Sequence, residues 1–179
     1  MKPPDKREMR ESYDELGGGL YDLRYEEEQT RKYDAAILLT LPKGDELLLD
    51  DGCGTGMLLR RLDSPCVGLD LAAELLRAAR QKLKPGHHLV QGDSEHLPLR
   101  AGVFQGVYAV TLIQNLPDKE LAVSEMRRAM SARATVFITA LKAAFDREYL
   151  AGLLEGKGFS KVDIVGDAGT NDWIACAQA

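Results

Sequence analysis

Apolar and polar residues follow two different periods along this chain, and the two alternate. Short apolar runs with few charges are typical of buried strands, whereas apolar residues that recur every three or four positions are typical of helices. Helical spacing is found at 71–83, 119–130 and 146–158. Apolar runs that predict strands lie at 45–50, 65–70, 87–93, 103–113, 133–141, 159–165 and 173–179.

This alternation predicts an α/β fold with a mostly parallel seven-stranded sheet and helices on both faces. The turn "GDAGTND" at 166–172 is too short for a crossover, so the last two strands are expected to form an antiparallel hairpin. A helical segment at 21–39 precedes the first strand and follows three glycines at 17–19, where we expect a flexible break. We therefore divide a single domain into an N-terminal helical segment, 1–44, and a core, 45–179.

Composition narrows the class of protein. The 179 residues suit one domain, and the 45% hydrophobic and 28% charged residues are ordinary for a globular chain. No apolar run approaches the roughly 20 residues that span a bilayer, and no signal peptide is evident. The three cysteines form no CxxC pair, so we expect no metal site, no disulfide framework and a cytoplasmic setting. A net charge of -5 disfavours broad nucleic-acid binding.

Three of the predicted strands end in or near an acid: Asp50, Asp70 and Asp93. A lone acid at such a place is often a helix cap or a solvated turn residue. In an open parallel sheet, however, ligands bind beyond the carboxyl ends of the strands. Three acids at equivalent positions therefore predict one ligand crevice.

The segment "LLLDDGCGTGMLL" at 47–59 indicates which ligand. Glycine-rich turns after a strand usually hold phosphates, but the carboxylates of Asp50 and Asp51 would repel a phosphate. Met57 stands where a dinucleotide fingerprint has its third glycine, and a Walker loop would need Lys and Ser/Thr. A ligand with adenine, ribose, no phosphate and a cationic amino-acid end fits better, and S-adenosylmethionine is such a ligand.

The ordered motifs resemble those of the class I, Rossmann-like methyltransferases that use S-adenosylmethionine. "LLLDDGCGTG" resembles the family's first motif and "VGLDLAAELLRAAR" its second. "VQGDSEHLPLRAGVFQGV" and "TLIQNLPDKELAVSEMRRAM" resemble the third and fourth, so the likeness covers about 45–140. Among the branches of this family, the sequence is most similar to the small type 11 methyltransferases.

The resemblance implies a role for each matching residue. Asp50 would receive the amino group of the cofactor's methionine part, and the loop of Gly52, Cys53 and Gly54 would pass beneath it. Asp70 would accept the ribose hydroxyls, with Leu71 on the adenine. The other implied contacts are Asp93 to the adenine amino group, Ser94 beside it, Thr111 at the methionine end, and Tyr25 from an N-terminal lid. Asp51 is expected to be a solvated or structural acid.

The sequence departs from the family pattern at positions that concern the acceptor. Asn115 replaces a histidine of the fourth motif, Gln105 replaces an acid of the third, and "SARA" replaces a Pro-Gly-Gly turn. Methyl transfer from a sulfonium is an in-line displacement, for which alignment matters most. A base is needed only if the acceptor holds a proton that it cannot shed. We therefore name Asn115 as the catalytic candidate, orienting the acceptor by hydrogen bonds.

Three classes of function remain at this point. The favoured one is methyl transfer to a nitrogen or oxygen of a small molecule. The same reaction on RNA or protein would require a partner, such as a small activator protein beside the strand at 87–91, or a homodimer. We expect the N-terminal segment to cover that edge instead. The other classes are a non-catalytic module that binds S-adenosylmethionine and a nicotinamide-dependent oxidoreductase, which Met57 and Asp50 disfavour.

Overall fold

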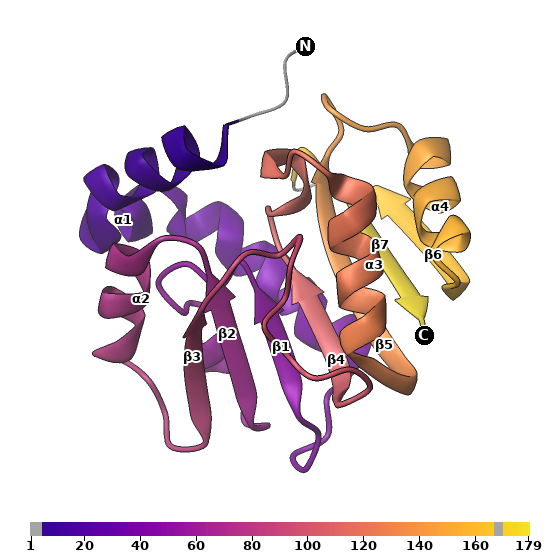
Figure 1. Ribbon diagram of the computed structural model, residues 1–179, viewed down its shortest axis with the longest axis horizontal. Coiled ribbons are helices and arrows are strands. Elements are labelled where there is room, and N and C mark those ends of the chain that lie inside the picture. Colours follow the sequence, from indigo (N-terminus) through magenta and orange to yellow (C-terminus); the bar gives the residue numbers. More distant parts are fainter. Residues whose placement is uncertain (1–4, 167–169) are drawn as a thin grey trace.

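The computed structural model describes residues 5–166 and 170–179, except for the side chains of residue 9 and of residues 13–28. Seven strands form one sheet in the order β3-β2-β1-β4-β5-β7-β6 (Figure 1). The first five are parallel, and β7 is antiparallel to both β5 and β6, which confirms the predicted fold class. The strands are β1 Leu48–Asp51, β2 Cys66–Asp70, β3 His87–Gln91, β4 Phe104–Ala109, β5 Met130–Leu141, β6 Ser160–Gly166 and β7 Asp172–Gln178.

Helices cover both faces of the sheet, and the buried side chains form one cluster on each face. β1 shows how the two clusters arise, because successive side chains of a strand point to opposite faces. Leu49 joins the cluster with α3 and α4, whereas Leu48 joins the cluster with α1 and α2. The helices are α1 Lys6–Thr40, α2 Ala73–Arg80, α3 Lys119–Ala129 and α4 Arg147–Gly156, with short 3₁₀ turns η1 Leu59–Arg61 and η2 Ile113–Asn115.

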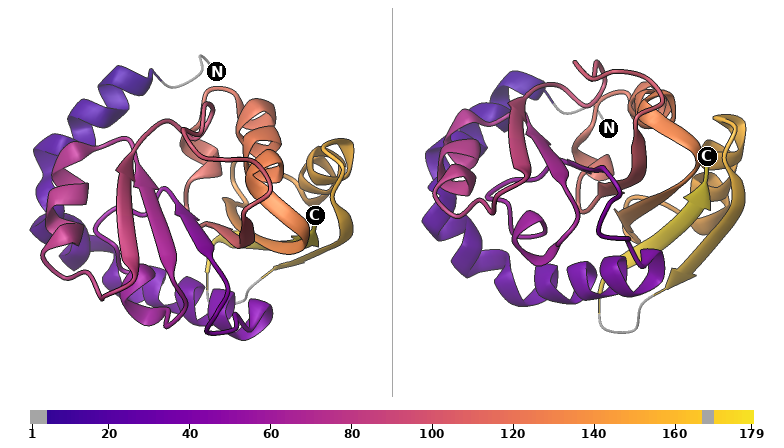
Figure 2. Two further views of the ribbon diagram at one scale, coloured as in Figure 1. Left: turned by 60° about the horizontal axis from the view of Figure 1, so that its bottom comes forward. Right: turned by 90° about the horizontal axis from the view of Figure 1, so that it is seen from below.

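Helix α1 differs from the expectation of a flexible break at 17–19. It runs without interruption from Lys6 to Thr40 and curves along the outside of α2 and the sheet (Figure 2). Glycine lowers helix propensity by about 1 kcal/mol per residue, a penalty that surrounding structure can override. Both ends of the helix are well defined. The Asp5 side chain accepts hydrogen bonds from the backbone of Arg7 and Glu8, and Leu41 ends the helix in a left-handed conformation.

The C-terminal part of α1 packs on the sheet through Tyr33 and Ala36, with Ile37 partly buried beside them. Leu38, an apolar residue of the same predicted helical segment, is 71% exposed. The helical period explains the difference, since residues 33, 36, 37 and 40 share a face and residue 38 turns away from it.

The fourth predicted strand ends earlier than the apolar run suggests. Regular pairing of β4 stops at Ala109, and the chain then turns through Thr111 into η2. Thr111 has a φ of 59°, in the left-handed region that a β-branched residue rarely adopts. The apolar run therefore predicted a strand that continues to residue 113, whereas the observed strand ends at Ala109 and the chain turns at Thr111.

The edge of the sheet at β3 is open, contrary to the expectation that the N-terminal segment covers it. Among the described residues, α1 packs chiefly against α2 and also touches β5. His88 and Gln91 of β3 are exposed, whereas His87 is buried. None of the helices in the described part of the chain has the length and the apolar composition that crossing a membrane requires.

Candidate functional site

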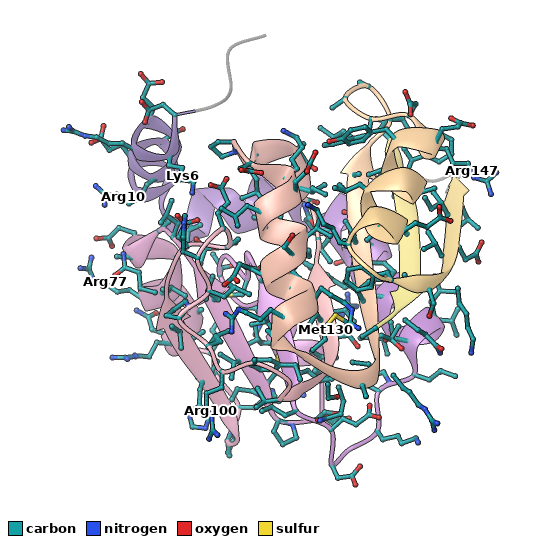
Figure 3. All side chains as sticks on the ribbon, turned by 45° about the vertical axis from the view of Figure 1, so that its right-hand side comes forward. Lys6, Arg10, Arg77, Arg100, Met130 and Arg147 are labelled. Carbon is teal, nitrogen blue, oxygen red and sulfur yellow. The ribbon has the colours of Figure 1, made fainter. Side chains whose placement is uncertain are left out.

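A cavity opens at the carboxyl ends of the parallel strands, where the sequence predicted it. The loops after β1, β2, β3 and β4 contribute its walls, and the first turns of α1 contribute Lys6 and Arg10. Figure 3 shows these two residues on the end of α1 that stands above the strand ends. Eight of the expected site residues line the cavity: Gly52, Gly54, Asp70, Leu71, Asp93, Ser94, Thr111 and Asn115.

The glycine loop after β1 leaves room for a ligand because side chains are absent from it. Gly52 has a φ of 78°, and a Cβ there would lie 2.9 Å from Cδ1 of Leu112. The loop is tied to β2, since the backbone N–H groups of Gly52 and Cys53 both donate to the Leu69 carbonyl, at 2.8 and 2.9 Å. Cys53 itself is buried in the cluster on the α1 face.

Asp70 holds the glycine loop and the following turn together. Its Oδ2 accepts a 2.8 Å hydrogen bond from the Gly54 N–H, and its Oδ1 accepts a 2.9 Å bond from the Ala72 N–H. Backbone N–H groups thus hold both oxygens of the carboxylate, and Asp70 lines the cavity as a fixed hydrogen-bond acceptor.

Asp93 and Glu95 connect the far wall of the cavity to α1. Lys6 Nζ lies 2.6 Å from Asp93 Oδ2 and 2.5 Å from Glu95 Oε2. Glu95 Oε1 in turn accepts a 2.7 Å hydrogen bond from the backbone N–H of Asp118, the N-cap of α3. Burial opposes ionisation of Asp93, but hydrogen bonds from Lys6 and from the Glu95 backbone outweigh it and lower its pKa. Lys6 therefore spans the cavity mouth, a contact that no sequence motif indicated.

Asp50 and Asp51 lie beneath the glycine loop and point to opposite faces of the sheet. Asp50 is 3% exposed, does not line the cavity, and has no hydrogen-bond partner for Oδ2 among the described residues. Burial, followed by the charges of Asp51 and Asp70, raises its pKa well above the usual value. A cation beside the unpartnered Oδ2 would stabilise the ionised form of this carboxyl.

Asp51 is fully buried, so the expectation of a solvated acid was wrong and the structural alternative holds. Its Oδ1 accepts a 2.6 Å hydrogen bond from the hydroxyl of Ser94, which lines the cavity. Burial raises the Asp51 pKa, the Ser94 bond lowers it, and the charges of Asp70 and Asp93 raise it again, to about 7.

Thr111 and Asn115 form the wall at the end of β4. The Thr111 N–H donates to Thr139 Oγ1 at 2.8 Å, and its carbonyl accepts from Asn115 Nδ2 at 3.2 Å. A non-glycine residue in the left-handed region costs about 1–3 kcal/mol and persists only where its surroundings hold it. Gln105, the departure in the third motif, lies outside this wall and bonds the Leu47 N–H at 2.8 Å. Tyr25 falls among the side chains that are not described.

We predict that Asp51 makes stability fall with rising pH. In the unfolded chain its carboxyl has an ordinary pKa near 3.8, and in the folded protein the pKa is about 7. The folded state therefore binds more protons between these values, and the free energy of unfolding decreases from about pH 4 to about pH 7. Asp51→Asn keeps an oxygen for Ser94 and removes the titration. Urea unfolding should show that this substitution raises the free energy of unfolding more at pH 8 than at pH 5, by on the order of 1 kcal/mol. An equal effect at both pH values would contradict this.

Comparison with known proteins agrees with the geometry. The model of the methyltransferase domain family matches residues 49–138, about half of the chain. Malonyl-[acyl-carrier protein] O-methyltransferase of Geobacter sulfurreducens is 35% identical over 71% of this chain and 50% of its own length. The enzyme of that name from Serratia marcescens is 28% identical over 82% of this chain and 59% of its own length. The chain thus spans about half to three-fifths of these curated relatives.

Solved structures show the same fold. A methyltransferase in complex with the Haloferax volcanii Trm112 methyltransferase activator superposes with a TM-score of 0.82, over 93% of this chain and 97% of the other, at 14% identity. A methyltransferase of Thermotoga maritima, described as a possible histamine N-methyltransferase, gives a TM-score of 0.68, over 88% and 97%, at 18% identity. With the family model, the ordered motifs and the strand order in agreement, the chain belongs to the class I, Rossmann-like methyltransferases of type 11.

Proposed function

We propose that the protein binds S-adenosylmethionine and transfers its methyl group to a nitrogen or oxygen of a small molecule. One observation carries this proposal: a glycine loop whose Gly52 and Gly54 line the cavity lies directly over buried carboxyls. A phosphate in the loop would meet Asp50, Asp51 and Asp70, whereas an ammonium would relieve their repulsion. The cofactor's amino-acid end provides that ammonium.

The residues present fit this cofactor. The unpartnered Oδ2 of Asp50 supplies an acceptor for the amino group, directly or through water. Asp70, which the N–H groups of Gly54 and Ala72 hold at the cavity wall, would accept the ribose hydroxyls. Leu71 would cover the adenine, and Asp93 beside Ser94 would receive its amino group. Gly52 lets Leu112 pack closely on the glycine loop at the cavity wall, since a side chain there would meet Leu112.

When bound, S-adenosylmethionine supplies a methyl group on a sulfonium that is already a good leaving group. The remaining task of the protein is to align the acceptor, and Asn115 lines the cavity where it can do so. Its Nδ2 is directed to the Thr111 carbonyl at 3.2 Å, which fixes the side-chain amide. The amide oxygen can then accept a hydrogen bond from the N–H or O–H group of the substrate that receives the methyl group. This bond would direct a lone pair of the substrate's nitrogen or oxygen towards the methyl group.

A small acceptor is supported by the walls of the cavity, which come from short loops and the first turns of α1. The curated relatives act on a malonyl group carried by acyl-carrier protein, which is a small nucleophile on a larger partner. The relatives extend beyond the length matched here, so the acceptor of this chain has to be identified directly.

A partnered reaction on RNA or protein is the second candidate, and the open β3 edge favours it. β3 carries no lysine or proline, the residues that commonly protect an edge against pairing with another chain. A methyltransferase of the same fold is known in complex with a small activator, Trm112. An activator strand added to β3 would extend the sheet and leave the cavity accessible.

We further propose that the segment 1–44 acts as a lid over the cofactor. The contacts of Lys6 with Asp93 and Glu95 support it, because they hold the start of α1 across the cavity mouth. The tyrosines proposed to reach the methionine end, Tyr21 and Tyr25, lie outside the described side chains.

Asp70→Ala should weaken binding of S-adenosylmethionine by about 1.5–3 kcal/mol, the range for hydrogen bonds to a charged group. The carboxylate is lost both as an acceptor for the ribose and as the anchor of the Gly54 N–H. Calorimetric titration measures the affinity. Asp63→Ala is the matched control, because Asp63 is an exposed acid that pairs with Lys84 outside the cavity. Wild-type affinity for Asp70→Ala would exclude Asp70 as the ribose ligand.

Lys6→Ala should speed release of S-adenosylmethionine by up to about fivefold, since partly exposed ion pairs contribute about 0–1 kcal/mol. Stopped-flow displacement measures the release rate. Arg7→Ala serves as the control, because Arg7 pairs with Glu11 on the exposed side of the same turn. Unchanged or slower release in Lys6→Ala would argue against a lid closed by Lys6.

Methyl transfer itself is tested with radiolabelled S-adenosylmethionine and a deproteinised metabolite pool. We expect the isolated chain to label a small molecule and Asn115→Ala to lower the rate at saturating cofactor about 10–100-fold, as for a misplaced reactant. A parallel reaction contains undigested extract with partners recovered by pull-down. Labelling of RNA or protein only, and only with a recovered partner, would favour the second candidate. No labelling in either reaction, with cofactor binding intact, would indicate a non-catalytic module.

A further inference from the structure

A buried lysine stands behind the wall of the cavity, and the functions assigned so far do not use it. Lys32 of α1 is 1% exposed and forms an ion pair with the fully buried Asp172 at the start of β7. Its Nζ also donates to Thr111 Oγ1 at 3.1 Å. Gln29, one turn earlier on α1, donates from Nε2 to the same oxygen at 3.0 Å.

Stability alone does not account for this arrangement. Removing two charges from water is costly, and well-packed apolar residues often replace a buried ion pair without loss of stability. Nearby positions of α1 that face the sheet, such as Tyr33 and Ala36, show that apolar packing is available there. The pair therefore has a reason beyond holding α1 on the sheet, and its contact with Thr111 indicates which.

Every polar group of Thr111 is held by a residue from another segment. Lys32 and Gln29 reach its hydroxyl from α1, and Thr139 of β5 accepts its N–H. Its carbonyl accepts from Asn115, at the end of η2. These bonds surround a residue whose φ of 59° is unfavourable for threonine. These hydrogen bonds explain how the protein keeps a threonine in the left-handed backbone conformation, at a position where glycine would be free of strain.

The conformation of Thr111 sets the direction of the next five residues. Leu112, Asn115 and Leu116 line the cavity immediately after it, and Leu112 packs against Gly52, where a side chain would clash with it. A change at Thr111 therefore moves the wall against which the acceptor would be aligned.

We propose that Lys32, held by Asp172, is a positioning residue for methyl transfer. It fixes Thr111 in the left-handed conformation and thereby places η2 and Asn115 beside the methyl group. This inference rests on the proposed function. Lys32 acts through Thr111, whereas Asp70 and Asp93, the proposed cofactor contacts, lie on other loops with hydrogen bonds of their own.

The first test separates positioning from stability. Lys32→Met leaves Asp172 without its cation, so it should lower both the melting temperature and the methyl-transfer rate on the metabolite pool. Lys32→Met/Asp172→Leu replaces the ion pair by apolar side chains and should recover the melting temperature. We expect the rate of the double variant at saturating cofactor to stay about 100-fold low. Thr111 is also an expected contact at the methionine end, so the affinity of the double variant for S-adenosylhomocysteine should fall. It should fall by less than the tenfold change that 1.4 kcal/mol would give, and therefore by much less than the rate.

Recovery of the rate together with the melting temperature would overturn the proposal, since Lys32 would then be structural only. The matched control is Arg61→Met, because Arg61 pairs with Asp34 and also ties α1 to the core, at 3.1 Å, but on the exposed side. Arg61→Met should leave the rate unchanged, and a loss equal to that of Lys32→Met would likewise contradict a role through Thr111.

The second test uses glycine at position 111, which adopts the left-handed conformation without help. Lys32→Met/Asp172→Leu should cost much less activity in a Thr111→Gly background than in the wild type, as expected for coupled positions. Equal losses in both backgrounds would overturn the proposal.

A third measurement does not depend on the acceptor. In a crystal structure of Lys32→Met/Asp172→Leu, we expect the Thr111 φ to leave the left-handed region and η2 to shift. An unchanged Thr111 and η2 would overturn the proposal even if the wild-type protein labels no small molecule. If the wild-type protein labels no small molecule, that result counts against the proposed small-molecule function and not against the positioning of Thr111 by Lys32.

Discussion

The crowding of carboxyl groups at the carboxyl ends of the parallel strands is the constraint on which the site depends. β1 places Asp50 and Asp51 on opposite faces, and β2 and β3 bring Asp70 and Asp93 to the same end of the sheet. Burial and mutual repulsion raise the pKa values of the first two. A cationic ligand without phosphates would relieve this repulsion. The negative charges at the carboxyl ends of the strands therefore favour a cofactor of that class.

Helix α1 contacts this end of the sheet at two points, which differ in how far they are exposed to solvent. Near its start, Lys6 meets Asp93 and Glu95 at a partly exposed position, where an ion pair is weak and reversible. Near its end, Lys32 is buried with Asp172, where breaking the pair would leave an uncompensated charge. The same helix is thus fixed beside the cavity wall at Thr111 and more loosely held over the cavity mouth.

The open β3 edge and the cavity lie on neighbouring parts of the same sheet. Because α1 packs on α2 and not along β3, a further strand has access to that edge without displacing the walls of the cavity. The fold therefore accommodates both candidate modes of action with one cofactor site.

The sequence by itself determined the order of the elements, the sheet type and the position of the cavity, because local periodicity and the glycine loop depend on neighbours in the chain. Eight candidate residues could be placed at the cavity in this way. The burial of Asp51, the end of β4 at Ala109 and the partners of Lys6 and Lys32 could not. They were decided only by the tertiary structure, because each depends on groups that meet across segments about 28 to 140 positions apart, and such meetings leave no local pattern.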